Sequence, residues 1–110
     1  MFSKIRLEVI CVGNELLYDR INTDVNILSA IMAKAGLRIS RCVTVPDIED
    51  EIIASVRECL KMSDILILTG GLGPTSDDIT KEALAKFLGK KLVYSGEIWQ
   101  GICERFARRG

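Results

Sequence analysis

The sequence contains no histidine among its 110 residues. This absence excludes Ser-His triads, histidine acid–base catalysis and most zinc sites, because each of them depends on an imidazole. Any catalysis must rely on carboxylates, lysine, cysteine, hydroxyl groups, backbone donors or a metal ion held by oxygen. The chain also lacks an excess of either charge, since 15 basic and 15 acidic residues cancel. The net charge therefore predicts neither a nucleic-acid partner nor an acidic membrane surface.

Long apolar runs are also missing. No stretch approaches the roughly 20 residues that span a bilayer, and Met1–Lys4 lacks the pattern of a signal peptide. We therefore expect a cytoplasmic protein with no membrane partner. The four cysteines have long, irregular gaps and no C-x-x-C pair, and a disulfide would suit a secreted chain better. We expect all four cysteines to be free thiols that pack as small hydrophobic side chains in the interior. They are Cys11, Cys42, Cys59 and Cys103.

Apolar strand-like runs alternate with segments of helical periodicity along the chain. This alternation predicts one α/β domain over residues 1–110, with three α/β/α layers and a mainly parallel sheet. A sheet of three strands is small for this architecture, so we expect a domain truncated at its C-terminus or a sheet edge left open for a partner. The predicted strands are 7–12, 37–45, 65–69 and a short 91–93; the predicted helices follow Thr23 and Asp47 and cover 80–88 and 97–108.

The continuous apolar run 65–69 predicts a central strand buried on both faces. It leads into Thr69-Gly70-Gly71-Leu72-Gly73-Pro74-Thr75-Ser76-Asp77-Asp78-Ile79-Thr80. Glycines let a ligand approach the main chain, and successive N–H groups beside a helix start can hold an anion. The alternative is a purely structural role, as a tight turn between a strand and a helix whose first residues are acidic. We expect phosphate binding by the backbone and hydroxyl groups of Thr69, Gly70, Gly71, Gly73 and Thr75.

Two adjacent carboxylates, Asp77 and Asp78, follow these glycines. Carboxylates repel a bare phosphate, so their presence makes sense if a divalent cation such as Mg²⁺ lies between them and the phosphate oxygens. We therefore predict that Asp78 and Asp77 hold a metal ion. The alternative roles are charge complementarity at a helix N-terminus for Asp78 and simple solvation for Asp77.

Three polar loops follow the three main predicted strands, at 13–22, 46–49 and 70–78. The carboxyl ends of parallel strands meet at one edge of a sheet, where ligands bind in such folds. Glu15 follows the first strand and is a possible ligand contact, or else a solvated acid. Asp47 follows the second strand and is either a functional acid or a helix cap, a role that aspartate favours.

The string from Thr69 to Ala83 closely resembles the signature of the molybdopterin-binding domain superfamily, and within it the CinA-like family of competence/damage-inducible proteins. Three further segments agree with that family in order and spacing, so the resemblance covers nearly the whole chain. They are Gly13–Leu17, Ile21–Asn26 and Val45–Asp47.

The resemblance implies a three-layer fold that binds a pterin or nucleotide phosphate, with molybdopterin as a possible ligand. Superfamily members act in molybdenum cofactor biosynthesis, and CinA-like domains are similar to metal-dependent pyrophosphatases of ADP-ribose-type substrates. The functional acids of the superfamily match Asp47 and Asp78, and the resemblance therefore implies that these two residues are catalytic in hydrolysis or nucleotidyl transfer. Family domains continue for several tens of residues, so a non-catalytic binding or oligomerisation module is the alternative. We expect a homo-oligomer, since 99–106 carries an apolar stripe.

Overall fold

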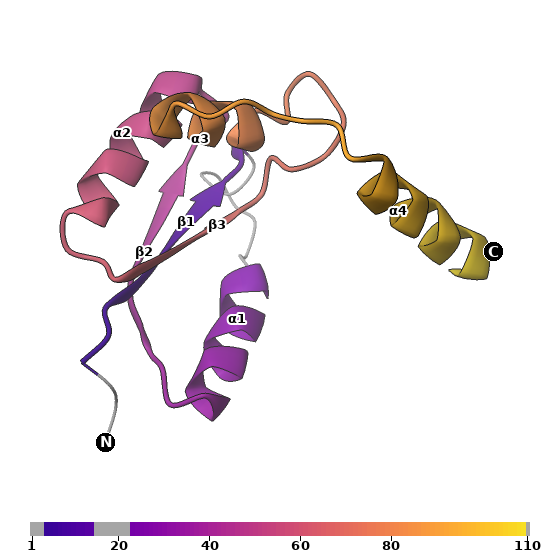
Figure 1. Ribbon diagram of the computed structural model, residues 1–110. Helices are drawn as coiled ribbons and strands as arrows, with labels where there is room; N and C mark the ends of the chain where they lie inside the picture. The colour runs from indigo at the N-terminus through magenta and orange to yellow at the C-terminus, as the bar shows by residue number, and fades with distance from the viewer. Residues whose placement is uncertain (1–3, 15–22, 110) are drawn as a thin grey trace.

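The computed structural model describes residues 4–14 and 23–109 of the chain. Three strands and four helices follow one another in the described residues (Figure 1). The strands and the helices fall close to the ranges expected from the periodicity of the sequence. They are β1 (Leu7–Val12), α1 (Thr23–Lys34), β2 (Ile39–Val45), α2 (Glu49–Leu60), β3 (Ile65–Thr69), α3 (Thr80–Leu88) and α4 (Gly96–Arg109).

The three strands form a parallel sheet in the order β2-β1-β3. All six residues of β1 are buried, whereas β3 is only partly covered and Ile65 is exposed. The prediction of a buried central strand at 65–69 is therefore wrong, because the connection through α2 carries the chain back across β1. Strand β1 gains a neighbour on each side, and β3 takes the outer place in the described sheet.

Helices cover both faces of the sheet, which confirms the three-layer α/β prediction. Figure 1 shows α2 and α3 on one side and α1 on the other. Alternate residues of β1 point toward the α2–α3 side, where they join the main buried cluster. Burying each of the larger members contributes about 1.5–3 kcal/mol to stability. The cluster comprises Ile10, Val12, Val45, Ile52, Val56, Cys59 and Ala83.

The C-terminal part of the chain departs most from expectation. The predicted strand at 91–93 is wrong: these residues have no regular structure, and Val93 is 84% exposed. Helix α4 extends away from the sheet and has no buried residue (Figure 1). The expectation for the cysteines holds only for Cys11 and Cys59, because Cys42 and Cys103 are exposed. No helix in the described ranges is long and apolar enough to cross a membrane.

A buried carboxylate at the amino ends of the strands was not expected from the sequence. Glu8 is fully buried in β1, and its two oxygens accept hydrogen bonds from Nε of Arg6 and Nε of Arg41, each at 2.8 Å. Burial acts to raise the pKa of Glu8, but the two guanidinium groups outweigh it and hold that pKa below its ordinary value. Arg41 also places Nη2 3.5 Å from Sγ of Cys59, so the group ties β1 and β2 to the end of α2.

We predict that Glu8→Gln lowers the free energy of unfolding by about 1–3 kcal/mol, because two charged hydrogen bonds lose their ionised acceptor. The arginines are more than a third exposed and can rehydrate, which limits the loss. Since folding lowers the pKa of Glu8, its contribution is complete above the pKa of an unfolded glutamate, about 4.3. It is lost as the pH falls further. Urea unfolding at several pH values measures this. Below about pH 4.3, the free energy of unfolding should fall more steeply with decreasing pH for the wild type than for Glu8→Gln. Equal falls in the two proteins would contradict the prediction.

Candidate functional site

The connections after β1 and β3 diverge at the carboxyl edge of the sheet. Strand β1 leads to α1 on one face, while the neighbouring β3 leads to α3 on the other (Figure 1). Adjacent parallel strands whose connections leave in opposite directions open a crevice between them, and ligands bind there in α/β folds. The candidate site is therefore the region where β1 and β3 end. Glu15, predicted to face the ligand, lies outside the described residues.

Two consecutive glycines begin the loop after β3 in a left-handed conformation, with φ of +86° at Gly70 and +66° at Gly71. A Cβ atom on Gly70 would collide with the carbonyl oxygen of Val12, the last residue of β1. Glycine is required here for its backbone angle and for this close approach. The expected glycine turn is thus packed directly onto the end of the central strand.

Thr80, the first residue of α3, holds this turn in place. Its Oγ1 donates a hydrogen bond of 2.8 Å to the carbonyl of Gly70, and its N–H donates one of 3.2 Å to the carbonyl of Gly71. Thr80 is buried, and a Cβ on Gly71 would collide with its Oγ1. A threonine at a helix start is often the cap residue, but here the cap residue is Ile79, which makes no side-chain cap bond. The only signal for its role was its place in the glycine–aspartate string.

The amide groups of the turn are available to a ligand. Within residues 4–14 and 23–109, no acceptor is found for the N–H groups of Gly71 or Leu72, while the carbonyls of Gly70 and Gly71 are both occupied by Thr80. A turn whose acceptors are satisfied and whose donors are not is suited to an anion. The first N–H groups of α3 add to this positive potential.

Asp78 organises the rest of the loop. Its Oδ2 accepts a hydrogen bond of 2.6 Å from Oγ1 of Thr75 and one of 3.2 Å from the Thr75 N–H. The Asp78 N–H donates in return to the carbonyl of Thr75 at 3.1 Å. The Thr75 hydroxyl lowers the pKa of Asp78; burial opposes this, while backbone bonds from Thr75 and Gly73 and the charge of Lys81 add to the lowering. Asp78 is therefore ionised at neutral pH, and one of its oxygens is engaged within its own loop.

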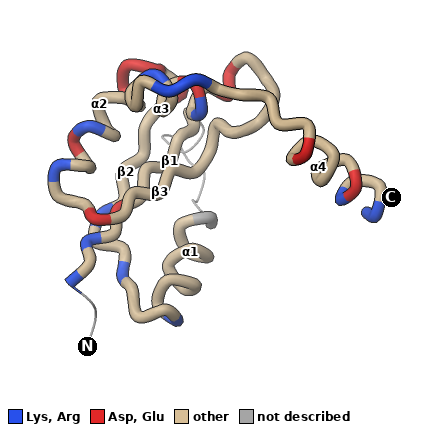
Figure 2. The backbone as a smooth tube through the Cα atoms, viewed as in Figure 1, with Lys and Arg blue, Asp and Glu red and all other residues tan. Residues whose placement is uncertain are grey.

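The predicted metal ligands provide only part of a coordination shell. No group of three or more acids or cysteines able to hold a metal is found in the described ranges. Asp77 is exposed beside Asp78, and Figure 2 shows this acidic segment in the loop between β3 and α3. Magnesium often binds one or two carboxylates together with phosphate oxygens. The two aspartates fit a cation that arrives with a phosphate ligand and do not fit a metal held by the protein alone.

Asp47 lies at the same edge but does not cap α2. The cap residue of α2 is Ile48, which makes no side-chain cap bond. The Asp47 Oδ2 instead accepts the N–H of Asn14 at 3.3 Å, and the Asp47 N–H donates to Oδ1 of Asn14 at 3.1 Å. This reciprocal pair joins the ends of β1 and β2. The structure thus brings Asp47 to the end of the central strand, onto which the glycine turn also packs.

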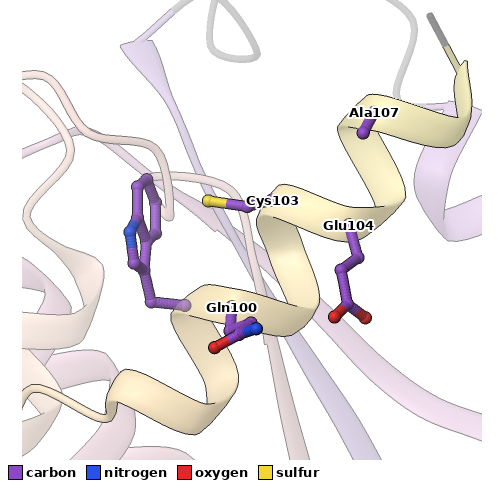
Figure 3. A pocket seen from close by; sticks show the side chains of 5 residues that line it. Gln100, Cys103, Glu104 and Ala107 are labelled. Carbon is purple, nitrogen blue, oxygen red and sulfur yellow. The ribbon is translucent and has the colours of Figure 1, made fainter.

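Two hollows lie along α4. This helix extends away from the sheet in Figure 1. Their volumes are about 210 and 450 Å³, and residues of α4 alone line them. Figure 3 shows the side chains of Gln100, Cys103, Glu104 and Ala107 projecting from this single helix. A hollow between side chains of one helix has no opposite wall. We therefore interpret both hollows as the open surface of α4 and not as ligand pockets.

Residues 8–109 match a family model described as a probable molybdopterin binding domain. The chain belongs to the molybdopterin-binding domain family. Its fold is similar to that of a crystallised CinA protein from Thermoplasma acidophilum, with a TM-score of 0.81, 34% identity and coverage of 93% of this chain and 61% of that one.

Curated relatives carry related names. A putative competence-damage inducible protein of Caldicellulosiruptor saccharolyticus is 47% identical over 104 residues, or 94% of this chain and 25% of that protein. A CinA-like protein of Kosmotoga olearia is 45% identical over 105 residues, or 94% of this chain and 26% of that protein. The chain thus spans about a quarter of the length of these two relatives. These matches confirm the resemblance to CinA-like proteins.

We predict that Thr80→Val lowers the free energy of unfolding by about 1–2 kcal/mol, because it keeps the side-chain shape but leaves the Gly70 carbonyl without its partner. Thr44→Val is the matched control, since half-buried Thr44 makes no side-chain hydrogen bond to a described residue. Urea unfolding of both variants is the measurement. Equal losses in the two variants would mean that the Thr80 hydroxyl does not support the turn.

Proposed function

We propose that this chain binds a phosphate group of a pterin or nucleotide ligand at the turn formed by residues 70–73. The observation that carries the proposal is the position of the turn. The N–H groups of Gly71 and Leu72, which have no acceptor in the described part of the chain, lie where the connections of β1 and β3 diverge. Membership of the molybdopterin-binding family favours molybdopterin as the pterin. The phosphate would accept hydrogen bonds from these amides and lie near the N-terminus of α3.

The side chains around the turn would divide the remaining tasks. Thr69 closes β3 and could offer its hydroxyl to the phosphate, while the Thr75 hydroxyl is already engaged by Asp78. Asp78, with Asp77, would hold Mg²⁺ or a similar ion through the oxygens that the loop leaves open. When bound together with the ligand, this ion would neutralise phosphate charge. A Cβ on Gly73 would lie 2.7 Å from Oδ2 of Asp78, so a larger residue there would displace this carboxylate.

If the chain turns its ligand over, the reaction that fits is hydrolysis of an ADP-ribose-type pyrophosphate or nucleotidyl transfer. The backbone donors of the turn would stabilise the phosphate oxygens as charge develops on them. Asp47, held at the same edge by Asn14, would be the second functional acid. The alternative is a module that binds the ligand without reaction. Appearance of AMP from ADP-ribose only when Mg²⁺ is added would separate turnover from binding.

We predict that Asp78→Asn reduces the gain in ligand affinity given by Mg²⁺ at least tenfold, about 1.4 kcal/mol. Asparagine keeps the shape of the side chain and removes its charge. Calorimetric titration with ADP-ribose, with and without Mg²⁺, measures the effect. Glu51→Gln, an exposed position on α2, is the charge-matched control. If Asp78→Asn retains the full response to Mg²⁺, the metal assignment is wrong, whereas phosphate binding without metal would stand.

We further propose that the chain self-associates through α4. Trp99, Ile102 and Phe106 lie at helical spacing and are 54%, 37% and 70% exposed. Figure 2 shows an acidic position at the start of α4, an acidic and a basic position side by side further along, and basic positions at its end. These are Glu97, then Glu104 and Arg105, and finally Arg108 and Arg109, so the two ends of the helix carry opposite charge. An antiparallel pair of α4 helices would cover the apolar stripe and place opposite charges together.

We predict that the chain sediments as a dimer or larger species at micromolar concentration, and that Phe106→Ser shifts it toward the monomer by removing an apolar anchor. Met62→Ser, at a position that is 69% exposed after α2, is the control and should leave the distribution unchanged. A wild-type chain that sediments as a monomer, with a melting temperature independent of concentration, would exclude this assembly.

A further inference from the structure

Two cysteine thiols lie against each other on neighbouring strands, apart from the candidate site. The Sγ atoms of Cys11 on β1 and Cys42 on β2 are 3.7 Å apart. The parallel register pairs Val9 with Cys42 and Cys11 with Thr44. Cys11 and Cys42 are therefore diagonal neighbours on the same face of the sheet, because residues two apart in a strand point the same way.

The two thiols differ in their access to solvent. Cys11 is fully buried, whereas Cys42 is exposed. A small oxidant can reach Cys42 first, and the buried thiol of Cys11 then lies within contact distance of the sulfur that has reacted. The other two cysteines are placed differently: Cys59 accepts a hydrogen bond from Arg41, and Cys103 lies on the extended α4.

We propose that Cys11 and Cys42 form a reversible intrachain disulfide that links β1 to β2 near the edge of the sheet that carries the glycine turn. The sulfur atoms must approach from 3.7 Å to about 2.05 Å, which requires side-chain rotation and a small adjustment of the strands. Cys11 directly precedes Val12, onto whose carbonyl Gly70 packs, so the link would brace the central strand beside the site. This inference does not depend on the identity of the ligand.

The oxidant would be a small-molecule disulfide such as oxidised glutathione. The Cys42 thiolate attacks one sulfur of the oxidant, which forms a mixed disulfide and releases one glutathione thiolate. Cys11 then gives its proton to solvent and attacks the Cys42 sulfur, which forms the Cys11–Cys42 bond and releases the second glutathione thiolate. Two protein thiols are oxidised, and one small disulfide is reduced to two thiols.

This exchange should be slow. Partial desolvation of its thiol, followed by the contact with Cys11, raises the pKa of Cys42 to about 11, so its thiolate is scarce at neutral pH. The reaction therefore suits prolonged exposure to an oxidant better than a rapid response, and an overnight incubation is needed to detect it.

The experiment uses the 110-residue chain with Cys103→Ser, which removes the exposed thiol of α4 and so prevents links between copies through that helix. The protein is incubated with oxidised glutathione and then analysed by free-thiol count, intact mass and peptide mapping. The expected result is the loss of two of its three thiols, a Cys11–Cys42 peptide link, no retained glutathione and full recovery with a reducing agent. No loss of thiols, or a link from Cys42 to Cys59, would overturn the proposal.

Two variants in the same background control for the order of events. Cys42→Ser removes the accessible thiol at an exposed position and should abolish the intrachain link. Cys11→Ala removes the second thiol, so Cys42 should retain glutathione as a stable adduct. If instead the parent Cys103→Ser protein retains glutathione on Cys42 while Cys11 stays reduced, Cys11 is not the resolving thiol and the proposal fails.

Discussion

The approach of the Gly70 backbone to the carbonyl oxygen of Val12 is the constraint on which the candidate site depends. No side chain on residue 70 would fit beside this carbonyl oxygen, so the chain leaving β3 passes directly over the end of the central strand. Gly70 and Gly71 both have left-handed backbone angles, and Thr80 donates a hydrogen bond to each of their carbonyls. Among the described residues, the N–H groups of Gly71 and Leu72 are left without an acceptor, and the same contacts bring α3 to this edge of the sheet.

One end of the sheet contributes to stability, and the other end carries the candidate site. At the amino ends of the strands, the buried Glu8 carboxylate is fully paired with Arg6 and Arg41, so it contributes to stability. At the carboxyl ends, donors and carboxylates lie in loops that are half-buried or exposed. This separation is physically reasonable, because a satisfied charge cluster holds strands together while unsatisfied donors are available to a ligand.

Local patterns predicted most of the elements. The apolar runs of β1 and β3, the helical periodicity of α2 and α3 and the glycine turn all occur where the sequence places them, because each depends on residues close in the chain. The order of the strands depends on distant contacts, which is why Ile65–Thr69 was wrongly expected at the centre of the sheet. The run 91–93 has strand-like residues, but none of the described strands pairs with it.

The roles of the site residues also depend on contacts between residues that are far apart in the chain. Asp47 and Thr80 both have good cap chemistry, yet their hydrogen-bonding groups bind Asn14 and Gly70, which are distant in the sequence. The phosphate, metal and catalytic roles of Asp47, Asp77 and Asp78 stay predictions, as does a role for Glu15. What the fold adds is that Asp47 and the glycine turn both meet the end of one buried strand.

Amide chemical-shift mapping with inorganic pyrophosphate is the most direct test of the central claim, which is that the turn at residues 70–73 binds phosphate. The account predicts that the largest shifts fall on the amides of Gly71 and Leu72 and on the first turn of α3, and that they saturate with pyrophosphate concentration. Shifts confined to the basic end of α4, around Arg108 and Arg109, or a complete absence of saturable shifts, would contradict it.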